Sequence, residues 1–241
     1  QVFGMSAVTA ITAQNTVELK SIHAVPVGII IDQILAVFED IGVDAVKTGM
    51  LLSEEIVCAV SGTLERLKPP HLVVDPVMIA KSGAELLDRQ ARSAVVKHLL
   101  PLAEVITPNL PEAEALLNWP VRTVDDMQEA ARAIHGLGPR NVVLKGGHLS
   151  GEITDILFDG KEITTFKSPR IDSKDTHGTG CTLGSAIAAC LALGTNVREA
   201  VAVAREFVMH AISEAPRLGA GAGPLNHCIR PVRQVREKGD Q

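Results

Sequence analysis

Short apolar segments alternate with longer amphipathic segments along most of the chain. The short segments are rich in β-branched residues and end at Gly, Pro or polar residues, which predicts strands. These predicted strands are residues 5–13, 44–47, 71–75, 103–106 and 141–145. The first of them, MSAVTAITA, contains no charged residue, so we expect a strand that is buried on both faces.

Helices are expected between these strands, where apolar residues recur every three or four positions. The predicted helices are residues 26–41, 53–68, 88–100, 111 onward, 124–137, 178–193 and 197–213. Ser53 precedes two glutamates and is the expected N-cap of the second helix. Residues 153–158 and 162–167 predict a hairpin, because Asp159-Gly160 suits a two-residue turn.

This alternation predicts the α/β class, with a central, mostly parallel sheet that helices cover on both faces. Parallel strands need crossover connections, and helices are the usual ones. We expect the 241 residues to form one domain, although two small domains would also fit this length.

Composition narrows the classes of function. Hydrophobic residues make up 46% of the chain and charged residues 21%, which is typical of a globular protein. The net charge is −5, the aromatic content is 2%, and Trp119 is the only tryptophan. A nucleic-acid partner is therefore not expected, because both a cationic surface and stacking platforms are lacking.

The four cysteines, Cys58, Cys181, Cys190 and Cys228, form no C-x-x-C pair, so neither a zinc site nor a disulfide framework is expected. We expect Cys58, Cys190 and Cys228 to be buried structural residues. No apolar run reaches the length of a membrane span, and no signal peptide is visible. A cytoplasmic protein without a membrane partner is the expectation.

Four loops directly follow predicted strands, and each begins with Gly, Pro or a polar residue. They are residues 48–50, 75–78, 107–112 and 145–148. For any one of them, a turn in the chain is the simpler explanation. Parallel sheets bind ligands beyond the carboxyl ends of their strands, so four such loops at one edge favour a site.

The strongest chemical signal is the run Asp175 to Cys181, which leads into an apolar helix. Its Gly-Thr-Gly core at a helix start leaves backbone N–H groups unpaired, as a phosphate cradle requires. The run matches neither the P-loop nor the dinucleotide-binding pattern. Cys181 falls in the first helical turn, where the helix dipole favours a thiolate, and His177 is expected to be a loop residue.

Taken together, these motifs resemble the hydroxymethylpyrimidine/phosphomethylpyrimidine kinases of thiamin biosynthesis, in an order that covers nearly the whole chain. The motifs are Thr-Ala-Gln-Asn (12–15), Lys-Thr-Gly-Met-Leu (47–51), Val-Asp-Pro-Val-Met (74–78), Ala-Lys-Ser-Gly (80–83), Ile-Thr-Pro-Asn-Leu-Pro-Glu-Ala (106–113), Val-Leu-Lys-Gly-Gly-His (143–148), Thr-His-Gly-Thr-Gly-Cys-Thr (176–182) and Gly-Ala-Gly-Pro-Leu-Asn-His (221–227). The resemblance implies a ribokinase-like, three-layer α/β/α fold. It also implies transfer of the ATP γ-phosphoryl group to a hydroxymethyl group or a phosphate of a small pyrimidine.

The resemblance assigns Gln14 and Met50 to the substrate. Gln14 would hydrogen-bond the aminopyrimidine through its amide, and Met50 would pack against the ring. Asn109 and Glu112 would bind ATP through Mg²⁺ and its waters, with Asp75 adding negative charge at the metal.

The remaining implied roles concern phosphoryl transfer. Lys145 would lie beside the transferred group and offset its charge. Gly178, Thr179 and Gly180 would form the anion hole, and Cys181 would accept the substrate proton.

The chain departs from this family at its start. Family members begin with a strand and a Gly-rich loop that closes the substrate pocket, and neither precedes Gln1. We therefore expect a chain that starts at Gln1 to be less stable and nearly inactive. The oligomeric state stays open, with a homodimer as one alternative.

Three other functions stay open. A pyridoxine/pyridoxal kinase has a similar fold, but Gln14 and the Gly-Thr-Gly-Cys run favour the pyrimidine. A Cys-His acyl-transfer enzyme would use Cys181 and His177, but it assigns no role to Asn109, Glu112 or Lys145. A non-catalytic binding module is the third alternative.

Overall fold

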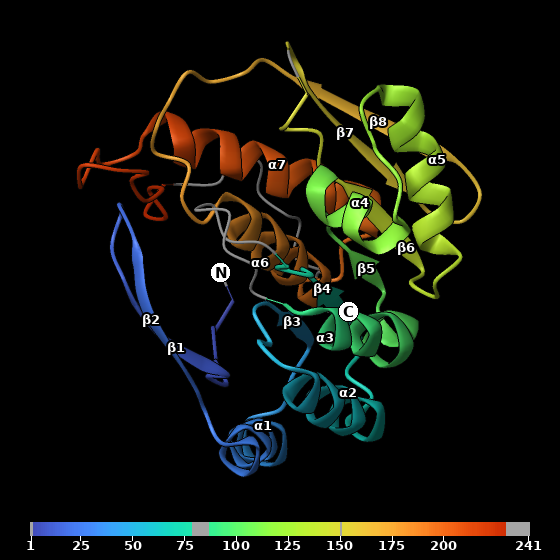
Figure 1. Cartoon of the computed structure of the whole chain (residues 1–241), viewed down its shortest axis with the longest axis vertical. Helices are drawn as coiled ribbons and strands as arrows, with labels where there is room; N and C mark the ends of the chain where they lie inside the picture. The colour runs from blue at the N-terminus through green and yellow to red at the C-terminus, as the bar shows by residue number, and fades with distance from the viewer. Residues whose placement is uncertain (1, 79–86, 150, 230–241) are drawn as a thin grey trace, which may run out of the picture.

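The computed structural model describes residues 2–78, 87–149 and 151–229, and its centre is a six-stranded sheet (Figure 1). The strands, in their order across the sheet, are β3 (Ala45–Thr48), β4 (His71–Val74), β5 (Val105–Ile106), β6 (Asn141–Leu144), β7 (Ile153–Phe158) and β8 (Ile163–Ser168). Neighbours from β3 to β6 pair in parallel, whereas β7 and β8 are antiparallel. The predicted mostly parallel sheet is confirmed.

Helices cover both faces of this sheet. One face packs against α1 (Val27–Asp40), α2 (Glu54–Leu67), α3 (Arg89–Ala94), η1 (Val95–Leu99), η2 (Leu100–Leu102), α4 (Leu110–Leu117) and α5 (Val124–His135). The other packs against α6 (Thr179–Ala192) and α7 (Val197–Ser213). In β4, Leu72 and Val74 belong to the first core and Val73 to the second, because successive side chains of a strand point to opposite faces. The predicted three-layer α/β/α arrangement is therefore confirmed.

Local sequence signals account for most helix starts. The Ser53 hydroxyl accepts the Ile56 N–H as the predicted cap of α2. Asn109 and Glu112 form a capping box at the start of α4. The helix predicted over 88–100 begins after Asp88, but it passes from α3 into a π-helical and then a 3₁₀ segment.

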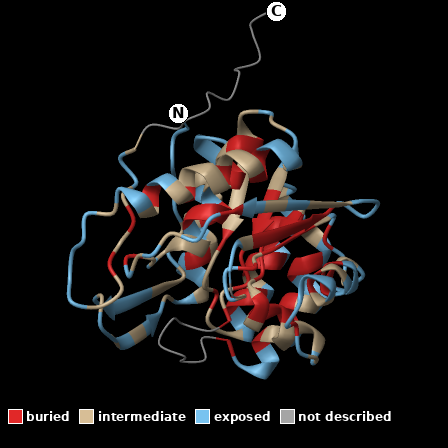
Figure 2. Ribbon diagram, turned by 90° about the horizontal axis from the view of Figure 1, so that it is seen from above, coloured by how far each residue is buried: buried red, intermediate tan, exposed pale blue. Residues whose placement is uncertain are grey.

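The N-terminal prediction is wrong. Instead of a strand over 5–13 buried on both faces, β1 (Ala10–Gln14) pairs with β2 (Leu19–Ala24) in a separate antiparallel hairpin. β1 is mostly exposed, and its Ile11 side chain is 59% exposed. The segment 5–13 lacks charge, yet its larger apolar residues Met5, Val8 and Ile11 are exposed, so the absence of charge alone does not establish burial. Figure 2 shows buried residues concentrated in the main sheet and the helices packed on it.

Two smaller predictions also need correction. The β7–β8 loop spans four residues rather than two, because the Asp159 carboxylate accepts the N–H groups of Lys161 and Glu162. Cys190 is buried as expected, but Cys58 and Cys228 are exposed, since Cys58 lies on the outer face of α2.

Within the described part of the chain, no helix has the length and apolar character needed to cross a membrane.

Candidate active site

The loops that follow β3, β4, β5 and β6 meet at one edge of the main sheet. The Asp75 N–H donates to the Thr48 carbonyl at 3.1 Å, which joins the loops after β4 and β3. The Lys145 N–H donates to the Pro108 carbonyl at 2.9 Å, and Asn109 and Lys145 form a parallel bridge. The four loops predicted to share an edge are therefore held together by backbone hydrogen bonds.

A cluster of four charged side chains, Lys47, Asp75, Glu112 and Lys145, lies at this edge. Asp75 is 3% exposed and lies between two lysines. Its Oδ1 is 3.2 Å from Lys145 Nζ, and its Oδ2 is 3.6 Å from Lys47 Nζ. The Thr107 hydroxyl donates to the same Oδ1 at 3.4 Å. Asp75 is thus a buried carboxylate with two cations and one neutral donor as partners.

Glu112 is the second buried carboxylate of the cluster. Its Oε2 accepts the Asn109 N–H at 2.8 Å, and its Oε1 accepts the Met78 N–H at 3.4 Å. The Asn109 side chain accepts the Glu112 N–H in return. Burial raises the pKa of Glu112, although the Lys145 ammonium opposes this shift. The capping box therefore fixes this carboxylate near Lys145.

Lys145 is the cation shared by both carboxylates. Burial acts to lower the pKa of Lys145, but the charges of Asp75 and Glu112 act in the opposite direction, and the net pKa is raised. Cys181 contributes to the same rise. The ammonium form of Lys145 is thus stabilised at the place where the sequence predicted a phosphoryl group.

The N-terminus of α6 lies directly against this cluster. Gly178 is its N-cap residue with φ 84°, a left-handed conformation that favours glycine. A Cβ on Gly180 would lie 3.1 Å from Lys145 Nζ and 3.8 Å from Asp75 Oδ2. Thr179 and Cys181 follow in the first turn, and the Cys181 side chain is exposed. Glycine at position 180 lets the helix start approach Lys145 closely.

A C-terminal segment links this helix start to the hairpin. The Ala222 N–H donates to the Thr16 carbonyl at 3.0 Å, and the His177 N–H donates to the Gly223 carbonyl at 3.0 Å. A Cβ on Gly223 would overlap the Asp175 carboxylate, which is 4% exposed. Residues 219–224 therefore connect the β1–β2 loop at Thr16 with the segment that precedes α6 at His177.

Gln14 and Met50 lie away from the charge cluster. Gln14 is exposed at the end of β1, opposite Leu19 and next to a register shift. Among the described residues, no hydrogen bond or ion pair of the cluster involves Gln14. Met50 is half-buried, and its carbonyl accepts the Thr9 hydroxyl at 2.7 Å. The structure brings the residues predicted to act on phosphate close together, whereas Gln14 and Met50, predicted to bind the substrate ring, lie apart from them.

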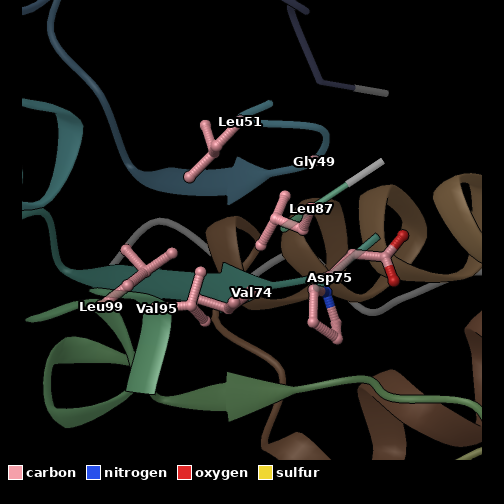
Figure 3. Close-up of a pocket in the computed structure, with 8 residues that line it drawn as sticks. Gly49, Leu51, Val74, Asp75, Leu87, Val95 and Leu99 are labelled. Carbon is pink, nitrogen blue, oxygen red and sulfur yellow. The ribbon is translucent and has the colours of Figure 1, made fainter. Parts of the chain in front are cut away.

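A small apolar crevice lies beside Asp75 on the other side of β4. Leu51, Val74, Leu87 and Leu99 supply much of its lining. Figure 3 shows the Asp75 carboxylate pointing away from these side chains, toward α6. The Asp75 carboxylate therefore faces α6, and the crevice is a gap in the apolar core.

The residues of the cluster fit Mg²⁺ only in part. Among the described residues, no group of three or more His, Cys, Asp or Glu side chains could hold a metal ion. Asp75 and Glu112 nevertheless offer two carboxylates, and Mg²⁺ is commonly bound by one or two carboxylates together with substrate phosphates. The donor set therefore suits a metal that arrives with a nucleotide. The predicted motif 80–83 lies outside the described residues.

Lys47 is the site residue that the sequence analysis missed. It belongs to the motif Lys-Thr-Gly-Met-Leu (47–51), in which the family resemblance implies a role only for Met50. The available signal was a lysine at the end of a predicted strand, directly before one of the four loops expected to form the site.

A three-layer α/β/α domain with a glycine-rich helix start against a buried lysine and two carboxylates is the arrangement of a ribokinase-like kinase. The family model for phosphomethylpyrimidine kinase matches residues 1–226. The chain belongs to the phosphomethylpyrimidine kinase family, so the predicted family and the kinase class are confirmed.

Three relatives illustrate this similarity. The chain is 52% identical to the thiamine biosynthesis bifunctional protein ThiED of Geobacter sulfurreducens, over 98% of this chain and 48% of that protein. It thus spans about half the length of this relative. The crystal structure of phosphomethylpyrimidine kinase from Clostridium difficile is 45% identical, with a TM-score of 0.78 over 87% of both chains. The ADP complex of Bacillus subtilis pyridoxal kinase is 39% identical, with a TM-score of 0.87 over 94% of this chain and 86% of that one.

Proposed function

We propose that this chain transfers the γ-phosphoryl group of ATP to 4-amino-5-hydroxymethyl-2-methylpyrimidine and then to its monophosphate. Membership of the phosphomethylpyrimidine kinase family supports this reaction. The observation that carries it is the close approach of Gly180 at the α6 start to Lys145 Nζ, with Asp75 beside both. Such a place offers N–H donors and a cation to a transferred phosphoryl group.

Two carboxylates and an amide side chain are assigned to the nucleotide. Asp75, Glu112 and Asn109 lie on the ATP side, where the carboxylates would hold Mg²⁺. When bound, Mg²⁺ neutralises negative charge on the phosphates. Glu112 also fixes the start of α4 through its capping box, so its carboxylate needs little rearrangement to act.

Lys145 and the first turn of α6 are assigned to the transferred group. The ammonium of Lys145 offsets the charge that develops on the phosphoryl oxygens. The N–H groups at the α6 start, around Gly178 and Gly180, would donate to the same oxygens, with Thr179 between them, whose N–H donates to the Thr176 carbonyl at 3.4 Å. The hydroxymethyl oxygen attacks the γ-phosphorus, the bond to ADP breaks, and the hydroxyl proton passes to the Cys181 sulfur.

The substrate ring is assigned to the hairpin side. Gln14 would donate to and accept from the edge of the aminopyrimidine, and Met50 would pack on its face. The 219–224 segment supports this assignment, because its hydrogen bonds to Thr16 and His177 join the loop after Gln14 to the phosphate side.

Pyridoxal is the second candidate substrate. The similarity to the Bacillus subtilis pyridoxal kinase, with a TM-score of 0.87, favours keeping it as an alternative. A Cys-His acyl-transfer reaction is set aside. Family membership indicates a kinase, and among the described residues no hydrogen bond joins Cys181 to His177.

A coupled assay of ADP release tests the proposal. The wild-type chain is given MgATP with the pyrimidine, with its monophosphate, or with pyridoxal, at a series of concentrations. We expect both pyrimidines to have the higher kcat/KM. A strong preference for pyridoxal would assign the chain to the alternative. No ADP release with any of the three, either from this chain or from a form extended at its N-terminus, would overturn the kinase proposal.

A further inference from the structure

Lys47 reaches the charge cluster from the side opposite to Lys145. It is the third residue of β3, its side chain is 15% exposed, and its Nζ lies 3.6 Å from Asp75 Oδ2. Lys145 Nζ binds the other carboxylate oxygen, Oδ1. Each oxygen of Asp75 therefore has its own ammonium partner.

The surface of α6 is shaped around both lysines. Gly180 and Gly184 are four residues apart and so lie on one face of the helix. A Cβ on Gly180 would meet Lys145 Nζ, whereas a Cβ on Gly184 would lie 3.2 Å from Lys47 Cε. Glycine inside a helix is destabilising relative to alanine. The close approach of the Lys47 side chain thus explains why residue 184 is glycine, although glycine destabilises a helix.

The charges of the cluster balance only when Lys47 is counted. Lys47 and Lys145 carry two positive charges, and Asp75 and Glu112 carry two negative charges. In the proposed reaction, Lys145 must direct its charge at the phosphoryl oxygens. Asp75, which is almost fully buried, would then keep Lys47 as its lysine partner.

We propose that Lys47 is a positioning residue that holds the Asp75 carboxylate in place and so releases Lys145 to act on the transferred phosphoryl group. This inference rests on the proposed kinase function. Lys47 acts through Asp75, and no contact between Lys47 and the substrate is required.

A double-mutant cycle tests this coupling. The proteins are the wild type, Lys47→Met, Asp75→Asn and the double variant, with Lys97→Met as a control for loss of an exposed lysine. We expect Lys47→Met to lower kcat by about 10–100-fold, as for other partners of active-site ligands, while KM for the pyrimidine changes little. In the Asp75→Asn background, the same change should lower kcat no further.

Thermal melting of the free enzyme provides a second readout that needs no turnover. Lys47→Met leaves the buried Asp75 carboxylate with Lys145 as its lysine partner and should therefore lower Tm. Adding Asp75→Asn removes that carboxylate charge, so the double variant should melt above Lys47→Met. Lys47→Arg restores the charge and should recover part of kcat.

Two results would overturn the inference. One is wild-type kcat in Lys47→Met, and the other is an equal loss of kcat from Lys47→Met with and without Asp75→Asn. If Lys47→Met does not fold, Gly184→Ala displaces the lysine stem while keeping its charge and should lower kcat in the same direction. A wild type that phosphorylates no pyrimidine would overturn the proposed function, whereas the melting cycle would still show whether Lys47 holds Asp75.

Discussion

The edge of the main sheet and the β1–β2 hairpin hold their side chains in different ways. At the edge, Asp75 and Glu112 are each 3% exposed and have several partners. On the hairpin, Ile11 and Val17 are 59% and 67% exposed. The chain before the hairpin is tied down by few hydrogen bonds, such as those between Val8 and Gln33.

This contrast separates the two halves of the proposed reaction. The groups assigned to phosphoryl transfer are preorganised by the buried sheet edge, which is where electrostatic stabilisation of a transition state is most effective. The group assigned to the pyrimidine, Gln14, lies on an exposed two-stranded sheet, which has little core of its own. We therefore expect changes at the edge to lower turnover and changes on the hairpin to weaken substrate binding.

The largest effect is expected for Cys181→Ala. Proton transfer by a positioned side chain contributes about 10²–10⁴-fold, so the first phosphorylation should slow by that order with little change in pyrimidine affinity. The second phosphorylation should slow less, because the attacking phosphate oxygen is already ionised. Rates of both steps, measured separately with the alcohol and the monophosphate, check this.

Cys181→Ser should recover part of the first step, and Cys58→Ala is the matched control for an exposed cysteine away from the cluster. Equal loss in both phosphorylations would contradict proton transfer to Cys181, and wild-type rates in Cys181→Ala would return it to a structural role.

Glu112→Gln should lower kcat by about 10–100-fold, the range observed when the ligand environment of a metal is altered. The amide keeps the size of the side chain and one acceptor for the Asn109 N–H, so α4 should still form. The Met78 N–H loses its acceptor, so Tm should fall, although burial, which raises the pKa of Glu112, makes loss of the charge itself favourable to folding. Steady-state kinetics across a Mg²⁺ titration, together with a melting curve, test both parts.

The matched control is Glu129→Gln on α5, which removes an exposed carboxylate that is not part of the cluster. Turnover that equals the wild type at every Mg²⁺ concentration would remove Glu112 from the nucleotide site.

Gln14→Ala tests the hairpin side of the comparison. Loss of hydrogen bonds to the ring should raise KM for the pyrimidine by about tenfold, which corresponds to about 1.4 kcal/mol. The value of kcat should change little, because the groups at the sheet edge are untouched. Ser21→Ala on β2 is the control, since Ser21 is exposed and lies opposite Ala13. A loss confined to kcat would show that Gln14 acts in phosphoryl transfer. It would contradict the assignment of turnover to the sheet edge and of substrate binding to the hairpin.

The same contrast explains which predictions from the sequence hold. The motifs around Asp75, Asn109, Lys145 and Gly178 follow strands or start helices, so secondary-structure signals place them at one edge. The role of Lys47 was missed because its partner, Asp75, directly follows the neighbouring strand β4, and the local sequence around Lys47 does not identify a partner 28 residues away. The prediction for segment 5–13 is wrong because an apolar sequence without charge can also lie on the surface, as the exposed side chains of Met5, Val8 and Ile11 show.

The smallest effect, and the sharpest test of the comparison, is expected from one substitution made in both regions. Ile106→Val in β5, where the side chain is 0% exposed, should lower the free energy of unfolding by about 0.5–1.5 kcal/mol. Ile11→Val in β1 should change it by less than about 0.5 kcal/mol, because an exposed methylene loses no packing. Denaturant unfolding measures both. If Ile11→Val costs as much as Ile106→Val, Ile11 must be covered in solution. Repeating the measurement at two protein concentrations would then show whether a second copy of the chain covers it, because only the stability of an associated form depends on concentration.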